Sequence, residues 1–178
     1  MKIDRFITPT WLGHVDISNE ISTKIRDWID FEKQIDPTGA KESTTQNGWQ
    51  YIFGQHDKNP EWLEALKPQI DSIRSEIQCT RVKTLWVVDY ENGGYQDPHF
   101  HNIGISDFVS IIINLEGTGD LILQDPRPLA VAQGKRFPNI ITLEKGDWCA
   151  FPAYIVHNSR PCIGKRSILV IDCFYTND

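Results

Sequence analysis

The spacing of the hydrophobic residues changes near position 80. Before it, Ile, Leu and Trp recur every three or four residues, whereas after it apolar residues alternate with polar ones or form short unbroken runs. The first pattern is typical of amphipathic helices, and the second is typical of strands buried on one or both faces. The 178 residues therefore predict a single domain, with a helical N-terminal buttress over 1–80 and a β-rich core over 81–178.

The helical part is interrupted by prolines and by a polar stretch. Ser18 or Asn19 can cap a first helix, and Pro37 ends it. Pro68 lies inside the second apolar stripe, where its ring and its missing N–H disfavour a regular helix. We expect helices over about 19–35, 60–66 and 68–78, the last two separated or kinked at Pro68, and a loop over 38–48.

The β-rich part predicts several short strands with glycine-containing turns between them. No helical pattern intervenes, which favours an antiparallel sandwich or barrel. A longer connection over 125–138 contains three prolines and is expected to form a rim or lid over a barrel mouth. The expected strands cover about 82–90, 97–101, 107–115, 120–124, 139–143, 147–151 and 166–175.

Charge and composition narrow the range of partners. The formal net charge is −6 and no run of consecutive Lys or Arg occurs, so a nucleic-acid partner is not expected. The beginning of the chain contains no long apolar stretch, so we predict neither a secretory signal nor a membrane span and expect a cytoplasmic protein. The four cysteines are widely spaced and form no Cys-x-x-Cys pair, which argues against a zinc ribbon or a redox motif.

Three histidines are the main sign of chemistry. His99 and His101 lie two residues apart, and side chains at that spacing on an extended segment point to the same face. His157 follows after several expected strands, where a third imidazole can complete a one-sided metal site. Neutral imidazole binds iron, copper, nickel and zinc alike, so the histidines alone do not select the metal. Asp97, on the same face as His99, is an alternative to His101 as the second ligand.

A cation within an apolar run suggests that the metal has a small acid beside it. Arg166 opens the run 167–171, and a buried guanidinium there can bind a carboxylate through two parallel hydrogen bonds. Other polar residues of the expected strands and loops could contact the same ligands. They are Ser110, Asn114 and Tyr95 as hydrogen-bonding partners of the small acid, and Arg127 as a contact for an acidic substrate.

Two segments together resemble the iron- and 2-oxoglutarate-dependent oxygenases, in particular small bacterial and phage-type members. The stretch Gly93-Gly94-Tyr95-Gln96-Asp97-Pro98-His99-Phe100-His101 is similar to their first ligand segment. The stretch 146–162 is similar to the segment that delivers their distal histidine, here His157. Arg166 stands nine residues later, where the family has the basic residue that binds the far carboxylate of 2-oxoglutarate. The resemblance covers about residues 85–175 and implies a mainly β fold, a double-stranded β-helix (a cupin-like jelly roll), with the N-terminal helices packed outside.

The sequence departs from the pattern of that family at two positions. His101 stands where the usual triad has Asp or Glu, and an imidazole in place of a carboxylate leaves the bound metal one unit more positive. The higher oxidation states of iron should then be harder to reach. Ile168 stands where many relatives have a Ser or Thr that shares the carboxylate with the arginine, so that hydroxyl must come from elsewhere or be absent.

The resemblance implies an Fe(II)- and 2-oxoglutarate-dependent dioxygenase. His99, His101 and His157 would hold the iron, Arg166 would neutralise the far end of 2-oxoglutarate, and a substrate would be hydroxylated with O2 while succinate and CO2 are released. Two alternatives stay open. One is a cupin-like three-histidine metalloenzyme that uses no 2-oxoglutarate, and the other is a jelly-roll module that binds a metal or ligand without catalysis.

Overall fold

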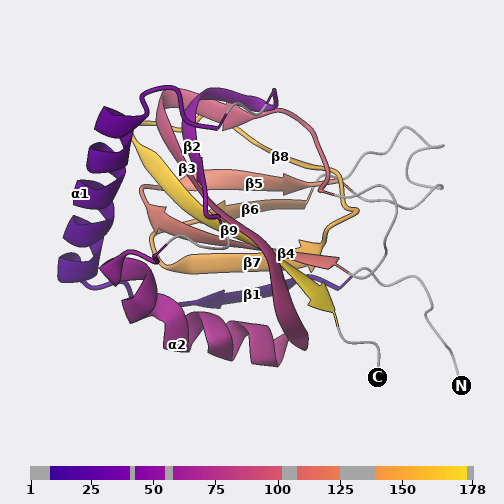
Figure 1. The fold of residues 1–178 in the computed structure, drawn as a ribbon. Helices are drawn as coiled ribbons and strands as arrows, with labels where there is room; N and C mark the ends of the chain where they lie inside the picture. The colour runs from indigo at the N-terminus through magenta and orange to yellow at the C-terminus, as the bar shows by residue number, and fades with distance from the viewer. Residues whose placement is uncertain (1–8, 41–42, 55–57, 102–107, 125–138, 176–178) are drawn as a thin grey trace, which may run out of the picture.

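The fold is described from a computed structural model for residues 9–40, 43–54, 58–101, 108–124 and 139–175 (Figure 1). Long strands of the second half lie beside two helices from the first half. In chain order the elements are β1 (Trp11–His14), α1 (Asn19–Ile35), β2 (Thr45–Ile52), α2 (Glu61–Glu76), β3 (Cys79–Gln96), β4 (Phe108–Glu116), β5 (Gly119–Leu123), β6 (Asn139–Leu143), β7 (Asp147–Pro152), β8 (His157–Ser159) and β9 (Arg166–Tyr175).

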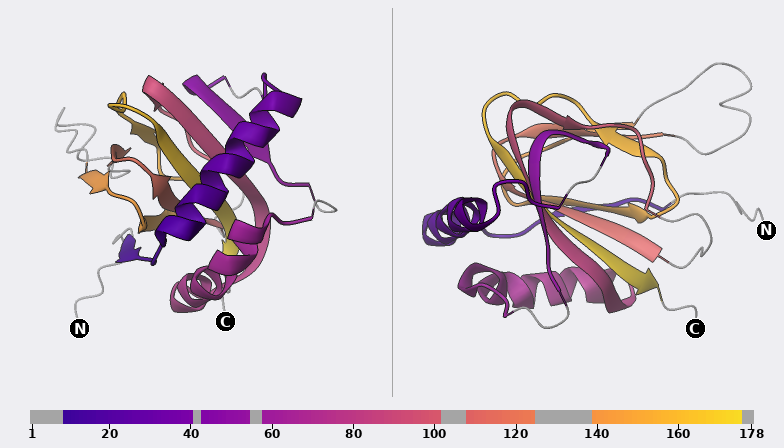
Figure 2. Two further views of the ribbon diagram at one scale, coloured as in Figure 1. Left: turned by 90° about the vertical axis from the view of Figure 1, so that its left-hand side faces the viewer. Right: turned by 45° about the horizontal axis from the view of Figure 1, so that its top comes forward.

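The strands form two antiparallel sheets that enclose a common interior. The larger sheet has the order β1-β7-β4-β9-β3-β2, and the smaller sheet has the order β6-β5-β8. Buried side chains of both sheets meet between them, among them Val170 and Phe151 of the larger sheet and Leu121 of the smaller one. The mainly β jelly-roll fold predicted from the sequence is therefore confirmed, with the helices on the outside (Figure 2).

Alternation along β9 assigns each of its residues to one of two faces. Leu169 packs in the hydrophobic cluster beneath the helices, whereas Ile168 and Val170 pack in the cluster between the sheets. Because successive residues of a strand point to opposite faces, Arg166 and Asp172 share the inner face with Ile168 and Val170. One strand thus carries a cation near one end of the interior and a carboxylate near the other.

Helix α1 has the bounds that the sequence predicts. Its first turn is capped by Ser18, whose side chain accepts a hydrogen bond from the backbone N–H of Ile21 at 3.2 Å. Ile25 and Ile29 are its buried residues, and they pack against the outer face of the larger sheet. Burying an isoleucine side chain stabilises a fold by about 1.5–3 kcal/mol, so this apolar stripe holds the helix on the sheet.

A buried ionic cluster fixes the position of α1 on β3 and β9. The Asp89 carboxylate accepts hydrogen bonds from two guanidinium nitrogens of Arg26 at 3.0 and 3.2 Å, and from the Ser167 hydroxyl at 2.6 Å. The Lys33 ammonium also contacts this carboxylate, whose side chain is fully buried. Burial alone would raise the pKa of Asp89, but the hydrogen bonds from Arg26, Lys33 and Ser167 outweigh burial and lower it.

Helix α2 continues through Pro68 as one element, so the predicted division into two helices is wrong. The proline ring lies on the exposed side of the helix, whereas Leu66 and Ile70 on either side of it are buried. A proline inside a helix costs about 3 kcal/mol. Burial of the apolar stripe on both sides of the proline is large enough to offset that cost.

Two further expectations about strands differ from the structure. Residues 45–48, expected in a loop, belong to the edge strand β2, which pairs with β3 through its backbone and needs no apolar pattern on its exposed face. The strand expected over 97–101 does not form, and an isolated bridge between His99 and His157 takes its place. Among the described residues, no helix is long and apolar enough to cross a membrane.

Candidate metal centre and its cavities

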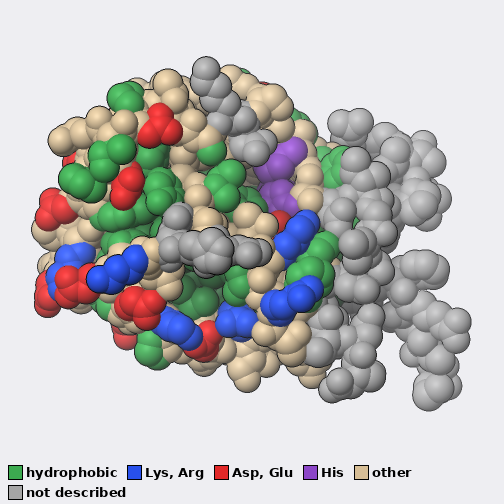
Figure 3. Space-filling model, viewed as in Figure 1, with side chains coloured by type: hydrophobic (Ala, Val, Ile, Leu, Met, Phe, Trp, Pro, Cys, Tyr) green, Lys and Arg blue, Asp and Glu red, His purple; other side chains and the backbone are tan. Residues whose placement is uncertain are grey.

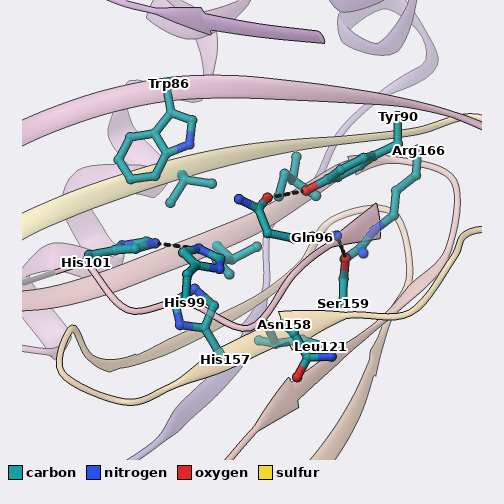
Figure 4. A pocket seen from close by; sticks show the side chains of 13 residues that line it. Trp86, Tyr90, Gln96, His99, His101, Leu121, His157, Asn158, Ser159 and Arg166 are labelled. Atoms are coloured by element: carbon teal, nitrogen blue, oxygen red, sulfur yellow. Dashed lines mark hydrogen bonds between the residues drawn. The ribbon is translucent and has the colours of Figure 1, made fainter. Parts of the chain in front are cut away.

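Three histidine side chains converge in the interior (Figure 4). His99 and His101 follow the end of β3, and His157 is the first residue of β8. The backbones of His99 and His157 exchange two N–H to O hydrogen bonds, of 2.9 and 2.8 Å, which bring the two segments together. One ligand nitrogen from each of the three rings lies within 4.8 Å of the others, and the Nε2 atoms of His99 and His101 are 3.3 Å apart.

The hydrogen bonds of the rings determine which nitrogen of each histidine is free. Nδ1 of His99 lies 2.8 Å from the backbone oxygen of Asp97, and Nδ1 of His157 lies 2.9 Å from that of Ile155. A carbonyl oxygen can only accept a hydrogen bond, so Nδ1 carries the proton in both rings. Their Nε2 lone pairs are therefore free for a metal, as in most histidine ligands of metalloproteins.

Burial keeps these two histidines in the neutral form that binds metals. Removal from water lowers the pKa of His99, and it lowers the pKa of His157 well below the ordinary value. The neighbouring imidazoles act in the same direction, because a second positive charge beside the first is unfavourable. No proton has to leave these two rings at neutral pH before a cation can bind.

The third histidine is held by a carboxylate that the sequence interpretation did not include. Nδ1 of His101 lies 2.9 Å from Oδ1 of Asp172 and 2.7 Å from the Ser110 hydroxyl. The Ser110 hydroxyl in turn lies 2.6 Å from the same carboxylate oxygen. Asp172 belongs to the inward-facing series of β9 that starts at Arg166, so its strand parity was the available signal for its inward position.

Three other residues proposed from the sequence are not placed in the site by the structure. Asp97 accepts a hydrogen bond from Gln46 through its carboxylate, at 2.9 Å, and it is not part of the histidine group found among the described residues. Tyr95 pairs with Gln46 in the sheet and does not line either of the two cavities described below, whereas Tyr90 lines one of them. Arg127 lies outside the described residues.

Arg166 lies at the far end of the interior from the histidines (Figure 4). Its side chain is buried, and its Nε donates a hydrogen bond to Oδ1 of Asn114 at 2.8 Å. The ion pairs formed within the described ranges do not include this guanidinium. Burial lowers the pKa of Arg166, because a cation removed from water is destabilised, and the negative charge of Asp120 offsets this only in part. A bound carboxylate would relieve this cost.

A glycine leaves the space that the guanidinium occupies. A Cβ atom built on Gly119 would lie 2.6 Å from Cδ, Nε and Nη1 of Arg166, which is closer than side chains tolerate. Asn114 is anchored as well, because its Nδ2 donates to the backbone oxygen of Gly117 at 2.7 Å. The position of the arginine is therefore set by the start of β5 and by the inner face of β4.

Two cavities meet at the histidines. The inner one is narrow, about 30 Å³, and leads from the histidines to Arg166 past Gln96 and Tyr90. The outer one measures about 350 Å³ and borders His99 and His101 from the other side. Figure 3 shows histidine side chains, in purple, at the surface of this face of the molecule. The remaining lining of the outer cavity consists of Thr44, Gln50, Ile52, Lys83, Thr84, Trp86, Gln96, Phe100 and Asp172.

The chemistry of this donor set fits a divalent transition metal. Two nitrogen ligands of one ion lie about 3.0–3.5 Å apart when each bond is about 2.1 Å, and the His99–His101 separation of 3.3 Å falls in that range. Three imidazoles from one side would leave other coordination positions open, which is characteristic of catalytic rather than structural metal sites.

Solved structures with a similar fold match almost the whole length of this chain. The carbocyclase SnoK from nogalamycin biosynthesis, a non-heme, alpha-ketoglutarate-dependent protein, matches with a TM-score of 0.69 at 14% identity, over 94% of this chain and 80% of that chain. A Trichoplax adhaerens prolyl hydroxylase, bound to a hypoxia inducible factor peptide, matches with a TM-score of 0.67 at 14% identity, over 93% and 83%. A Pseudomonas putida prolyl-4-hydroxylase matches with a TM-score of 0.64 at 10% identity, over 96% of this chain and 94% of that chain.

No family model and no curated protein sequence matches. The chain therefore has the fold of the Fe(II)- and 2-oxoglutarate-dependent oxygenases, the superfamily that its sequence motifs predict.

Proposed function

We propose that this protein is an Fe(II)- and 2-oxoglutarate-dependent dioxygenase that hydroxylates a substrate. The observation that carries the proposal is the placement of the three-histidine cluster and the buried Arg166 at the two ends of one cavity. A metal site alone would fit many enzymes. A lone buried cation beyond the metal site calls for a ligand with an acidic group at its far end.

In this proposal His99, His101 and His157 hold the iron through their Nε2 atoms. Arg166 pairs with the distal carboxylate of 2-oxoglutarate, and Asn114 keeps the guanidinium aimed into the cavity. The inner cavity has room for only about two water molecules, so side chains must move when the dicarboxylate binds. Gln96 lies between the histidines and Arg166 in Figure 4 and is the side chain best placed to move aside.

The outer cavity is the proposed site of the primary substrate. It borders two of the three histidines and is lined by a mixture of aromatic, hydroxyl, amide and charged groups. When bound, the iron would supply the oxidation, in which 2-oxoglutarate and O2 are converted to succinate and CO2 and one oxygen atom enters a C–H bond of the substrate. The apolar walls formed by Trp86, Ile112 and Val170 would keep bulk water away from the reacting groups.

The proposal is tested by anaerobic addition of Fe(II) and then 2-oxoglutarate, followed by admission of O2. Chelation of the keto acid should produce a visible charge-transfer absorption, and succinate should form even without the primary substrate. Arg166→Lys retains the charge but loses the two-pronged geometry, so it should weaken 2-oxoglutarate binding while iron still binds.

Arg160→Ala is the matched control for the arginine. This residue is six positions earlier, is 55% exposed, and forms an ion pair with Asp120 at 3.1 Å. It should leave the affinity for 2-oxoglutarate unchanged. Absence of both the absorption and succinate in the iron-loaded wild type would refute the proposal.

The donor set itself favours a second candidate, a three-histidine metalloenzyme of the cupin type that uses no 2-oxoglutarate. No carboxylate belongs to the metal-binding group found among the described residues. In that case iron would bind normally, 2-oxoglutarate would leave the spectrum of the iron complex unchanged, and Arg166 would bind the substrate directly.

A further inference from the structure

We propose that Asp172 supplies the negative charge that a ligand carboxylate would otherwise bring to the metal, and that it acts through the ring of His101. Asp172 is a positioning residue in this proposal and not a ligand. The proposal builds on the metal site of the proposed function but does not depend on 2-oxoglutarate or on any reaction.

The first step of the argument is the contact between the two side chains. Oδ1 of Asp172 lies 2.9 Å from Nδ1 of His101, and both side chains are at most 10% exposed. A hydrogen bond from imidazole to a carboxylate is stronger than one to a neutral oxygen. It also makes the opposite nitrogen of the ring a better donor to a metal.

The second step is the difference among the three histidines. His99 and His157 donate from Nδ1 to backbone carbonyl oxygens, which are neutral. Within the histidine cluster, a charged partner at Nδ1 is found at His101. This is the residue that occupies the carboxylate position of the usual triad. The missing charge is therefore present in the structure, displaced outward by the length of one imidazole ring.

The third step is the way the carboxylate is held. Ser110 faces Asp172 directly across the β4–β9 pair, and its hydroxyl bonds to Oδ1 at 2.6 Å. The same hydroxyl lies 2.7 Å from Nδ1 of His101. The three groups form a closed triangle on the inner face of the sheet, so the carboxylate cannot turn away from the ring without losing two contacts.

The test is the affinity of the metal-free protein for Co(II), measured anaerobically without 2-oxoglutarate. Asp172→Asn removes the charge and retains the shape, so we expect binding about 10- to 100-fold weaker. Asp147→Asn is the matched control, because its carboxylate also contacts an imidazole, at 2.8 Å from Nδ1 of His14, but that histidine does not belong to the cluster. It should bind Co(II) within about twofold of the wild type.

Ser110→Ala separates charge from orientation. It leaves the Asp172 carboxylate in place, so binding should stay within about fivefold of the wild type. Unchanged affinity in Asp172→Asn would overturn the proposal. So would an equal loss in Ser110→Ala, which would show that orientation matters rather than charge, or an equal loss in Asp147→Asn, which would show that the effect is not specific to the cluster.

A measurement on the Zn(II)-loaded wild type covers the case in which Asp172→Asn does not fold. The Nδ1–H proton of His101 should resonate further downfield in NMR spectra than those of His99 and His157, because its acceptor is charged. Three indistinguishable protons would contradict the proposal. Normal Co(II) affinities combined with no succinate would instead count against the proposed reaction, so the two failures can be distinguished.

Discussion

The guanidinium of Arg166 donates through Nε to Oδ1 of Asn114 at 2.8 Å, and both side chains are buried on the inner face of the larger sheet. Nε therefore points toward Asn114, and the other guanidinium nitrogens remain available for a ligand. The amide group of Asn114 is itself fixed by its bond to the Gly117 backbone. The arginine is consequently oriented before any ligand arrives, which reduces the entropy lost on binding.

Replacing Asn114 by Ala should therefore weaken 2-oxoglutarate binding by about 10- to 100-fold, because the buried Nε loses an acceptor worth about 1.5–3 kcal/mol. Iron binding should be unaffected, since Asn114 contacts none of the histidines. The measurement is a titration of the Fe(II) protein with 2-oxoglutarate, followed by visible absorption. Asn139→Ala, an exposed asparagine on β6, is the control and should behave as the wild type. A normal titration for Asn114→Ala would show that the arginine needs no such support.

Gly119→Ala tests the space that Arg166 requires. The new methyl group would lie 2.6 Å from three atoms of the arginine side chain, so the guanidinium must shift. We expect weaker 2-oxoglutarate binding with Co(II) affinity retained, both measured by titration. Thr118→Ala, at the exposed neighbouring position, should change neither. If Gly119→Ala bound 2-oxoglutarate as tightly as the wild type, Arg166 would be able to bind the dicarboxylate from a shifted position.

Trp86 should report metal binding by its fluorescence. Its ring packs edge-on against His101 with centroids 5.3 Å apart, and it lines both cavities. A paramagnetic ion such as Co(II) close to the indole is expected to quench its emission. Trp86→Phe should remove most of the quenching while leaving the affinity within a few fold, as measured by absorption. Trp28 lies on α1 and packs against Trp62 of α2, so Trp28→Phe is the control and should leave the quenching intact.

Asp89→Asn should destabilise the fold without a direct effect on the metal. The change removes the buried anion, while Arg26 and Lys33 keep their partly exposed partners Glu116 and Glu91, so we expect a loss of about 1–3 kcal/mol. Urea unfolding of the metal-free protein at pH 7 measures the loss. Asp71→Asn is the control, because its ion pairs with Lys67 and Arg74 are partly exposed helix pairs that contribute about 0.5 kcal/mol or less each. A loss as small as that of the control would mean that α1 is held by its apolar face alone.

The contribution of Asp89 should also depend on pH. The folded-state pKa of this carboxyl lies below its ordinary value of 3.8, so the unfolded chain takes up the proton more readily. Its stabilising effect is therefore complete above about pH 4 and is lost as the pH falls from there through the folded-state pKa. The difference in stability between wild type and Asp89→Asn should shrink below pH 4, as measured by thermal unfolding. A difference that is constant down to pH 3 would contradict this account.

The sequence was sufficient wherever the determining interactions are local. The range 19–35 of α1 follows from the Ser18 cap, the repeat of isoleucines and Pro37, all within a few residues of one another. Strands 139–143 and 166–175 follow from runs of β-branched residues between turns. The inward direction of His99 and His101 was likewise predictable from their spacing, although the segment forms a single bridge and not a strand.

Contacts between residues distant in the sequence were decided by the tertiary structure alone. Asp172 lies 71 residues from His101 and Arg166 lies 52 residues from Asn114, so no local pattern indicates that they meet. The first half of strand β2 is polar, and it forms because β3 offers it an open edge. The sequence by itself determined the local elements and the residue types able to hold a metal and an acid. The pairing of the strands decided which carboxylate contacts which imidazole. Such contacts depend on the register across the sheet and not on neighbours along the chain.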